Sequence, residues 1–215
     1  MLSTDEQAAF QESIARVRQL AAYKLGQAQG ADAAIAFTVH LHRGLDAVAR
    51  QASATGPAPD CQAGCAHCCH LRVEATDPEI FRIAQHLRSL PPAVQAHMTN
   101  ALRQHGAQVQ AQAQGGAPRP ACAFLADNRC SIYEVRPAAC RKAHSLSVQQ
   151  CASLAPQIPQ NLRLLVDAEA LMAGTAQAYR DRQLPANAHE LNAAVLTALT
   201  DATAQERWFG GDAVF

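Results

Sequence analysis

The sequence predicts a mainly α-helical protein whose helices pack around an irregular, cysteine-rich core. Alanine, leucine and glutamine fill much of the chain and favour helices, whereas β-branched runs are scarce. Apolar residues recur at helical spacing before and after the cysteines. All eight cysteines lie in the middle of the chain, between positions 61 and 151. Together these observations favour a helical fold with an irregular centre.

A length of 215 residues suits one domain with an ordinary hydrophobic core. We expect a single domain over residues 1–215. It is made of an N-terminal helical hairpin (1–55), a cysteine-cluster core (58–152) and C-terminal helices (160–215). No linker in the sequence requires a second domain.

The first 55 residues predict two helices. Ser3 and Glu6 have capping-box spacing ahead of apolar residues at helical spacing, and Gly30 is expected to end this helix. A second helix is expected over residues 31–52, before a Gly/Pro-rich break at 55–59. The two helices therefore predict a hairpin that leads to the first cysteines.

Two further helices follow the first cysteine group. Thr76 to Glu79 carry a helix-start signal, with a capping threonine, an early proline and a glutamate three residues on, and this helix should end near Leu90. Pro91 and Pro92 open another helix that should end near Gln114, followed by a Gly/Pro-rich loop at 115–120.

The stretch 122–151 is irregular by its pattern, with short apolar pieces between cysteines. Two more helices are predicted after it, over residues 162–172 and 191–199, and Pro185 separates them. Trp208, the only tryptophan, is expected to dock with its neighbouring phenylalanine on the helices.

Charge and hydropathy exclude several classes of protein. Eighteen basic and eighteen acidic side chains cancel, which argues against a nucleic-acid surface that depends on a global positive field. No stretch approaches the roughly 20 apolar residues of a transmembrane helix. The start of the chain lacks the basic and apolar regions of a signal peptide. We expect a cytoplasmic protein with no nucleic-acid or membrane partner, and a protein partner stays open.

The first cysteine group has the spacing of a metal site. Cys65 and Cys68 are separated by two residues, so one backbone turn can direct both thiolates at one metal ion. Cys61 lies four residues before Cys65, and one helical turn would place the two on one side. Cys69 follows Cys68 directly, and helix neighbours point about 100° apart. Either one of these two thiols is a spare, or there is more than one metal ion, or the spare thiol has a redox or substrate-contacting role.

The second cysteine group is too widely spaced to form a single knuckle, so tertiary folding must bring its thiols together. We predict that both groups form one metal-binding core. Its candidate ligands are Cys61, Cys65, Cys68, Cys69, Cys122, Cys130, Cys140 and Cys151. Soft sulfur ligands select zinc, copper(I) or iron–sulfur clusters, and four cysteines suit structural zinc and an iron–sulfur cluster equally. A disulfide framework is the minority alternative, because such frameworks mostly serve small secreted domains.

Basic residues surround the second cysteine group. Five basic side chains face two acidic ones between positions 119 and 142: Arg119, Arg129, Arg136, Arg141 and Lys142 against Asp127 and Glu134. This local positive excess is what a thiolate-rich centre needs nearby. The alternative is a solvated basic loop, which we consider the weaker explanation because Arg136 and Arg141 flank Cys140.

Three histidines, His67, His70 and His144, lie within the cysteine-rich segments. With eight thiols available, we expect these imidazoles to hydrogen-bond ligating sulfurs rather than to ligate. His40 and His42, on the second predicted helix, are expected to be surface or packing residues.

The order of the cysteine motifs resembles a known family. The motifs are Cys61–Cys69, Cys122-Ala-Phe-Leu125, Cys130-Ser-Ile-Tyr133 and Arg136-Pro-Ala-Ala-Cys140-Arg141. They resemble the YkgJ-type cysteine-cluster (CxxCxxCC) family, described as zinc- or iron-chelating, over roughly positions 58 to 152. A related pattern in flagellin lysine methylases implies an iron–sulfur centre. The family usually opens with two residues between its first two cysteines, whereas this chain has three, and Cys151 lies outside the commonest pattern.

Three functions follow from these residues. The first is a metal-binding protein that chelates zinc or iron through its clustered cysteines, with an iron–sulfur cluster as one form of the iron. The second is a metal- or iron–sulfur-dependent protein-modifying enzyme that uses Tyr133, Arg136 and Arg141. No nucleotide-binding loop, paired carboxylates or nucleophile motif supports that enzyme. The third is a thiol redox switch at Cys68 and Cys69. We favour the first.

Overall fold

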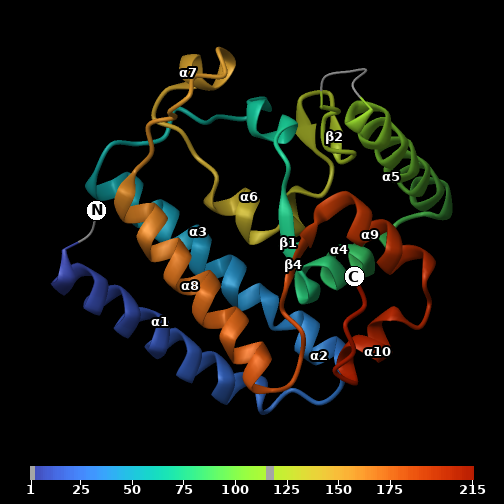
Figure 1. Ribbon diagram of the computed structural model, residues 1–215, viewed down its shortest axis with the longest axis horizontal. Helices are drawn as coiled ribbons and strands as arrows, with labels where there is room; N and C mark the ends of the chain where they lie inside the picture. The colour runs from blue at the N-terminus through green and yellow to red at the C-terminus, as the bar shows by residue number, and fades with distance from the viewer. Residues whose placement is uncertain (1–2, 115–118) are drawn as a thin grey trace.

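The computed structural model describes residues 3–114 and 119–215, and it is mainly helical, as predicted (Figure 1). Helices α1 (Thr4–Leu25), α3 (Thr38–Thr55) and α8 (Leu162–Asp181) pack side by side. Helix α9 (Leu191–Thr200) packs on both α4 (Asp77–Arg88) and α5 (Pro92–Ala113). The shorter helices are α2 (Ala31–Ala36), α6 (Ala138–Lys142), α7 (Val148–Ala152), α10 (Ala204–Phe209) and the 3₁₀ turns η1 (His67–His70) and η2 (Tyr133–Val135).

Two short antiparallel strand pairs complete the fold. Strand β1 (Glu74–Thr76) pairs with β4 (Ala188–Glu190), with Ala75 opposite His189. Each of these strands runs directly into a helix, α4 or α9, so their pairing sets the starts of the two helices side by side. Strands β2 (Leu125–Ala126) and β3 (Arg129–Cys130) form a hairpin. Neither pair was predicted from the sequence.

The capping signal at the start of α1 is confirmed. The Ser3 N–H donates to Glu6 Oε2 at 2.7 Å, and the Glu6 N–H donates to Ser3 Oγ at 3.3 Å. The predicted end at Gly30 is wrong, because α1 ends at Leu25 and Gly26 caps it. Gly30 has a left-handed φ of 88° and precedes α2 instead.

The predicted helix over 31–52 is interrupted at Phe37, which separates α2 from α3. Side-chain hydroxyls take two carbonyls of α2: Tyr179 Oη donates to Ala34 O at 2.7 Å, and Thr38 Oγ1 donates to Ile35 O at 2.8 Å. Both hydroxyl groups compete with the backbone donors that would continue the helix. Tyr179 lies on α8, so one of these two hydrogen bonds is a contact between distant parts of the chain.

The other predicted helices are confirmed, with α4 starting after Thr76, α5 at Pro92, and α8 and α9 on either side of Pro185. Part of the predicted loop at 115–120 lies outside the described residues.

The main hydrophobic core lies between α4, α9 and α10. Phe81 of α4 is fully buried, and its ring centroid lies 5.3 Å from that of Trp208. Trp208 Nε1 donates to Pro185 O at 2.8 Å, so its polar atom is also satisfied. The predicted docking of Trp208 is confirmed, while Phe209 beside it stays 40% exposed.

Helices α1 and α8 approach closely at Gly174. A Cβ atom at this position would lie 2.7 Å from both Ile14 O and Val17 Cβ. Only glycine permits this approach, which brings the start of the chain against α8. Within residues 3–114 and 119–215, no helix is both long and apolar enough to cross a membrane.

Candidate metal centre

The two cysteine groups lie along one edge of the molecule. Figure 1 shows the segment before β1, the β2–β3 hairpin and α7 along this edge, above the ends of α3 and α8. The first group occupies the loop before η1 and η1 itself, and the second occupies the hairpin, α6 and α7. All eight cysteines are free thiols. Groups separated by more than fifty residues therefore meet on one face.

A backbone hydrogen bond joins the first cysteine group to the second. The Cys122 N–H donates to Cys69 O at 2.8 Å, and the Leu125 N–H donates to Cys122 O at 2.9 Å. Leu125 pairs with Cys130 across the hairpin. Cys69, Cys122 and Cys130 are thus held in one connected piece of backbone.

The hairpin turn depends on two residues with left-handed backbone. Asp127 and Asn128 have φ values of 49° and 58°. Asp and Asn tolerate this conformation better than other side chains, and two such residues make the turn that matches strand twist. The Asp-Asn pair was the sequence signal for this hairpin, and reading positions 122–151 only as irregular missed it.

Cys61 and Cys151 lie toward the other end of this edge. The Asp60 N–H donates to Ser145 O at 2.9 Å, and Asp60 Oδ2 accepts from the Val148 N–H at 3.3 Å. Helix α7, which carries Cys151, contacts η1. These contacts hold the start of the first cysteine group against the end of the second.

The adjacent thiols Cys68 and Cys69 interact with each other. A hydrogen bond from the Cys69 thiol lowers the pKa of Cys68 to about 6, and the same bond raises the pKa of Cys69. Both residues lie in the 3₁₀ turn η1 and not in an α-helix.

The other thiols form two electrostatic neighbourhoods. Burial, together with the nearby thiols Cys122, Cys68 and Cys130, raises the pKa of Cys140 to about 12. Burial also raises the pKa of Cys61, with additional effects from Cys65, Cys68 and Cys151. Cys68 acts in both neighbourhoods. The repulsion between neighbouring thiolates, which raises their pKa values, is reduced when a cation replaces the protons.

Within the described part of the chain, no three Cys, His, Asp or Glu side chains are gathered into a set that could hold a metal ion. The shared ligand set predicted from the sequence therefore stays a prediction. The thiol side chains are still suitable donors for a metal ion. One guanidinium, with an N–H that has no hydrogen-bond partner, acts on several of them and can offset the negative charge of thiolates.

That guanidinium belongs to Arg136. It counteracts the effect of burial on the pKa values of Cys130 and Cys140, and it adds to the lowering of the pKa of Cys68. Its Nε is buried without a hydrogen-bond partner, and its Cζ lies 3.8 Å above the centre of the Tyr133 ring. A buried, unpartnered N–H beside sulfur atoms fits an environment that becomes negative when thiolates form.

Residues 60–158 match the model of the CxxCxxCC family, whose description reads "putative zinc- or iron-chelating domain". The resemblance inferred from the cysteine motifs is thus confirmed, and the match supports a general metal-binding role for the CxxCxxCC domain. No curated protein and no solved structure matches the chain.

Two basic residues of the CxxCxxCC domain are engaged away from the thiols. Arg141 Nη1 donates to both carboxylate oxygens of Asp46 at 2.9 and 3.0 Å, and Lys142 Nζ donates to Glu169 at 2.7 Å. The expectation that Arg141 compensates thiolate charge is therefore wrong. Its role is to tie α6 to α3, and Arg136 is the basic residue that acts on the thiols.

His144 is also engaged by backbone groups. Its Nδ1 lies 2.9 Å from Lys142 O, and its Nε2 lies 2.7 Å from the Asn161 N–H. Because a carbonyl only accepts and an amide N–H only donates, Nδ1 carries the proton and Nε2 accepts. His144 has no ring nitrogen left for a sulfur or a metal, whereas His67 and His70 lie exposed in η1.

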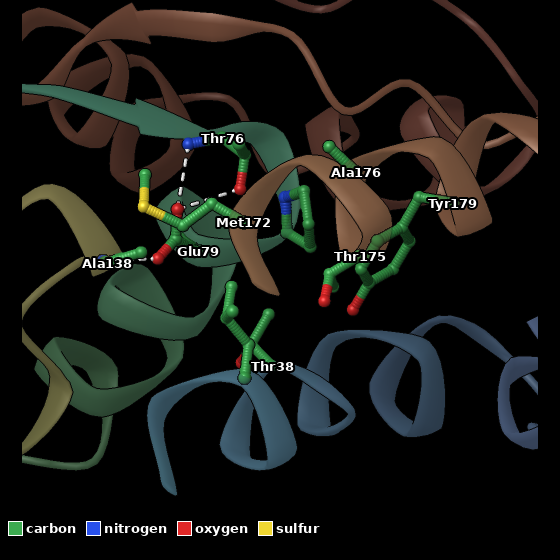
Figure 2. Close-up of a pocket in the computed structure, with 10 residues that line it drawn as sticks. Thr38, Thr76, Glu79, Ala138, Met172, Thr175, Ala176 and Tyr179 are labelled. Carbon is green, nitrogen blue, oxygen red and sulfur yellow. Dashed lines mark hydrogen bonds between the residues drawn. The ribbon is translucent and has the colours of Figure 1, made fainter. Parts of the chain in front are cut away.

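Glu79 holds the first residue of α6. The sequence indicated this glutamate only as part of a helix cap. Figure 2 shows its carboxylate between Thr76 and Ala138. Oε1 accepts from the Ala138 N–H at 2.6 Å and lies 3.1 Å from His42 Nε2, while Oε2 accepts from the Thr76 N–H and hydroxyl. Burial alone would raise the pKa of Glu79, but these hydrogen bonds hold it below its usual range. Glu79 therefore fixes the start of the helix that carries Cys140.

His42, expected to be a surface or packing residue, is buried and also pairs with Glu79. His42 is 4% exposed and lies on α3, so the pair joins α3, α4 and α6. A cavity of about 20 Å³ beside Glu79, lined also by Thr38, Thr175 and Tyr179, has room for about one water molecule.

Asn192 of α9 contacts the CxxCxxCC domain from outside it. Its Oδ1 accepts from the Ala123 N–H at 3.0 Å and from the Cys122 thiol at 3.5 Å, and its Nδ2 donates to Glu190 at 2.8 Å. Burial raises the pKa of Cys122 to about 11. No sequence signal marked Asn192, because it lies 70 residues from the thiol it contacts.

Proposed function

We propose that this protein binds zinc or iron through thiolates of its clustered cysteines, with the iron either alone or in an iron–sulfur cluster. The observation that carries the proposal is the join between the two cysteine groups. The Cys122 N–H donates to Cys69 O and so joins the two groups, and the Arg136 guanidinium acts to lower the pKa of a thiol in each group, Cys68 and Cys130. Four soft sulfur donors are a common ligand set for zinc and for iron–sulfur clusters.

The residues of the chain have distinct parts in this function. The candidate ligands are the eight cysteines named from the sequence. Arg136 offsets negative charge when the thiols lose their protons, and Glu79 and Asn192 hold the backbone that carries Cys140 and Cys122. A bound metal would supply a strong local positive charge and replace several protons. Free thiols in this number also fit a reducing compartment such as the cytoplasm.

Metal and sulfide analysis of protein purified without oxygen tests the proposal. Zinc without colour indicates a zinc site, while iron with a broad thiolate-to-iron absorption band indicates an iron or iron–sulfur site. The Arg136→Ala variant should retain less metal than the Arg129→Ala variant, because Arg129 is exposed on strand β3. Protein that contains neither metal nor sulfide, and that takes up neither zinc nor iron, would refute the proposal.

A further inference from the structure

Helices α3, α4 and α6 meet around the buried carboxylate of Glu79. Its Oε1 lies 3.1 Å from His42 Nε2 of α3 and accepts from the N–H of Ala138, the first residue of α6, at 2.6 Å. Each of the three helices carries an arginine within one turn of its residue at this meeting point. We call them the arginine cluster: Arg43 on α3, Arg82 on α4 and Arg141 on α6.

Hydrogen bonds place Arg141 against the elements that carry the other two arginines. Its Nη1 donates to both carboxylate oxygens of Asp46 on α3, and its Nη2 donates to Glu134 O of η2 at 2.6 Å. Asp46 lies three residues after Arg43, so the two share a face of α3. The η2 turn packs on α4, which carries Arg82. The fold therefore gathers the arginine cluster from three helices.

The carboxylates near the arginine cluster are already engaged. Asp46 pairs with Arg141, and Glu79 accepts from backbone N–H groups on two elements. Within residues 3–114 and 119–215, the side chains of Arg43 and Arg82 have neither a hydrogen bond nor an ion pair, and the Nε of Arg82 is buried without an acceptor. Two positive charges of the cluster are thus left without a counterion.

The surroundings of Arg82 favour a negative ligand. Burial lowers the pKa of Arg82, and the positive charges of Arg141 and Arg43 also lower it, an effect that requires both groups to lie near it. A buried N–H donor without an acceptor is destabilising, and so is repulsion between like charges. A bound anion would accept from this N–H and offset the repulsion.

We propose that Arg43, Arg82 and Arg141 form a binding site for a phosphate group. The planar guanidinium presents its N–H donors in a fork that matches phosphate oxygens. A phosphate dianion would balance the two unpaired charges of Arg43 and Arg82, whereas a single carboxylate would balance only one. This site uses no cysteine, so it adds a second ligand to the proposed metal-binding function.

Isothermal titration calorimetry of the full chain with inorganic phosphate, at constant ionic strength, tests the site. We expect one phosphate per chain. Arg43→Ala and Arg82→Lys should each weaken binding about tenfold, because each removes charge-assisted hydrogen bonds of an arginine fork. Arg50→Ala is the matched control. It removes the same charge from an exposed position on α3, about 10 Å along the helix from Arg43, and should change the Kd by less than about twofold.

The control also defines the contrary result. Absence of phosphate binding would overturn the site. Equal binding by the wild type and the Arg43 and Arg82 variants, or an equal loss in Arg50→Ala, would overturn it as well. A parallel titration with phenyl phosphate separates two sources of the ligand. Binding as tight as that of inorganic phosphate indicates the phosphate group of a larger molecule, while exclusion of the phenyl ester indicates the free ion.

A second measurement uses the unaltered chain and does not depend on how the variants fold. Phenylglyoxal modifies arginine side chains, and mass spectrometry locates the modified residues. Phosphate should protect Arg43 and Arg82 and leave Arg50 reactive. Equal modification of Arg43 and Arg82 with and without phosphate would overturn the site. Because no cysteine is involved, this result would leave the proposed metal binding standing.

Discussion

The helical part of the molecule and its cysteine-bearing edge are held together in different ways. In the helical part, α1 lies directly against α8 at Gly174, and Phe81 and Trp208 fill the core between α4, α9 and α10. At the cysteine-bearing edge the elements are two to five residues long, and a few buried polar groups hold them. Glu79, His144 and Asn192 each capture backbone N–H groups there. Apolar packing therefore dominates in the helical part, while individual polar groups fix the short elements that carry the thiols.

Replacement of Glu79 should have the largest effect, because this residue belongs to both regions. Glu79→Ala leaves the Ala138 N–H, the Thr76 N–H and His42 without their shared acceptor, and we expect a loss of about 3–5 kcal/mol in the free energy of unfolding. Urea denaturation of the metal-free protein measures this loss. Glu74→Ala is the matched control: its exposed pair with Arg72 is worth less than about 1 kcal/mol. Equal losses in the two variants would contradict the anchoring role.

Gly174→Ala tests the helical part alone. The added methyl would press on Ile14 O and Val17, and we expect a loss of about 1–3 kcal/mol. Gly106→Ala on α5 is the control, because a Cβ there meets nothing within 4 Å, and it should stabilise the helix by about 0.5–1 kcal/mol. Thermal unfolding followed by circular dichroism compares them. Folded Gly174→Ala protein should bind as much metal as the wild type, and reduced binding by this variant would mean that the two regions are not separable.

Asn192→Ala should have a smaller effect on stability and a local effect on one thiol. The Ala123 N–H and the Cys122 thiol lose their common acceptor, and we expect a loss of about 1 kcal/mol. In the metal-free protein, alkylation of Cys122 should become faster while that of Cys140 is unchanged. Thr200→Ala, an exposed change at the end of the same helix, should stay within about 0.5 kcal/mol of the wild type. Unchanged reactivity of Cys122 would show that Asn192 does not hold this thiol.

The smallest predicted effect is in acid. The pKa of Glu79 is lowered in the folded protein, so its ionised form adds stability above the unfolded pKa, and this stability is lost as the pH falls through the folded pKa. Between about pH 5 and pH 3, the free energy of unfolding should fall more steeply for the wild type than for Glu79→Gln. Burial raises the pKa of Asp77, which acts in the opposite direction in both proteins. Parallel pH profiles would be inconsistent with a buried, ionised Glu79.

Local signals in the sequence predicted the features that neighbouring residues determine. The capping patterns at Ser3 and Thr76 and the prolines before α5 mark real helix starts, because a cap is formed within three or four residues. The break at Phe37 was missed, and one of the two hydroxyls that take carbonyls of α2 there comes from Tyr179, 145 residues away from Ala34. The pairing of β1 with β4 was missed because the two strands lie far apart in the sequence. Each strand is also only three residues long and carries little pattern.

The candidate site shows the same limit. Cysteine spacing was enough to predict the family, because it is a property of residue type and order. The sequence did not reveal which basic residue faces the thiols. Arg141 is next to Cys140 in the sequence and Arg136 lies four residues before it, yet Asp46 of α3 engages Arg141, and Arg136 is the one that acts on the thiols. Glu79 looked like an ordinary helix cap until folding placed Ala138 against it.

The binding of the metal by thiolates is tested most directly by X-ray absorption spectroscopy of the anaerobically purified protein, recorded at the absorption edge of the metal. Thiolate binding predicts that the atoms nearest the metal are mainly sulfur, at about 2.3 Å if the metal is zinc. Replacement of Cys130 and Cys140 by serine should remove sulfur from that shell. A first shell of nitrogen and oxygen in the wild type, unchanged by these replacements, would contradict the account.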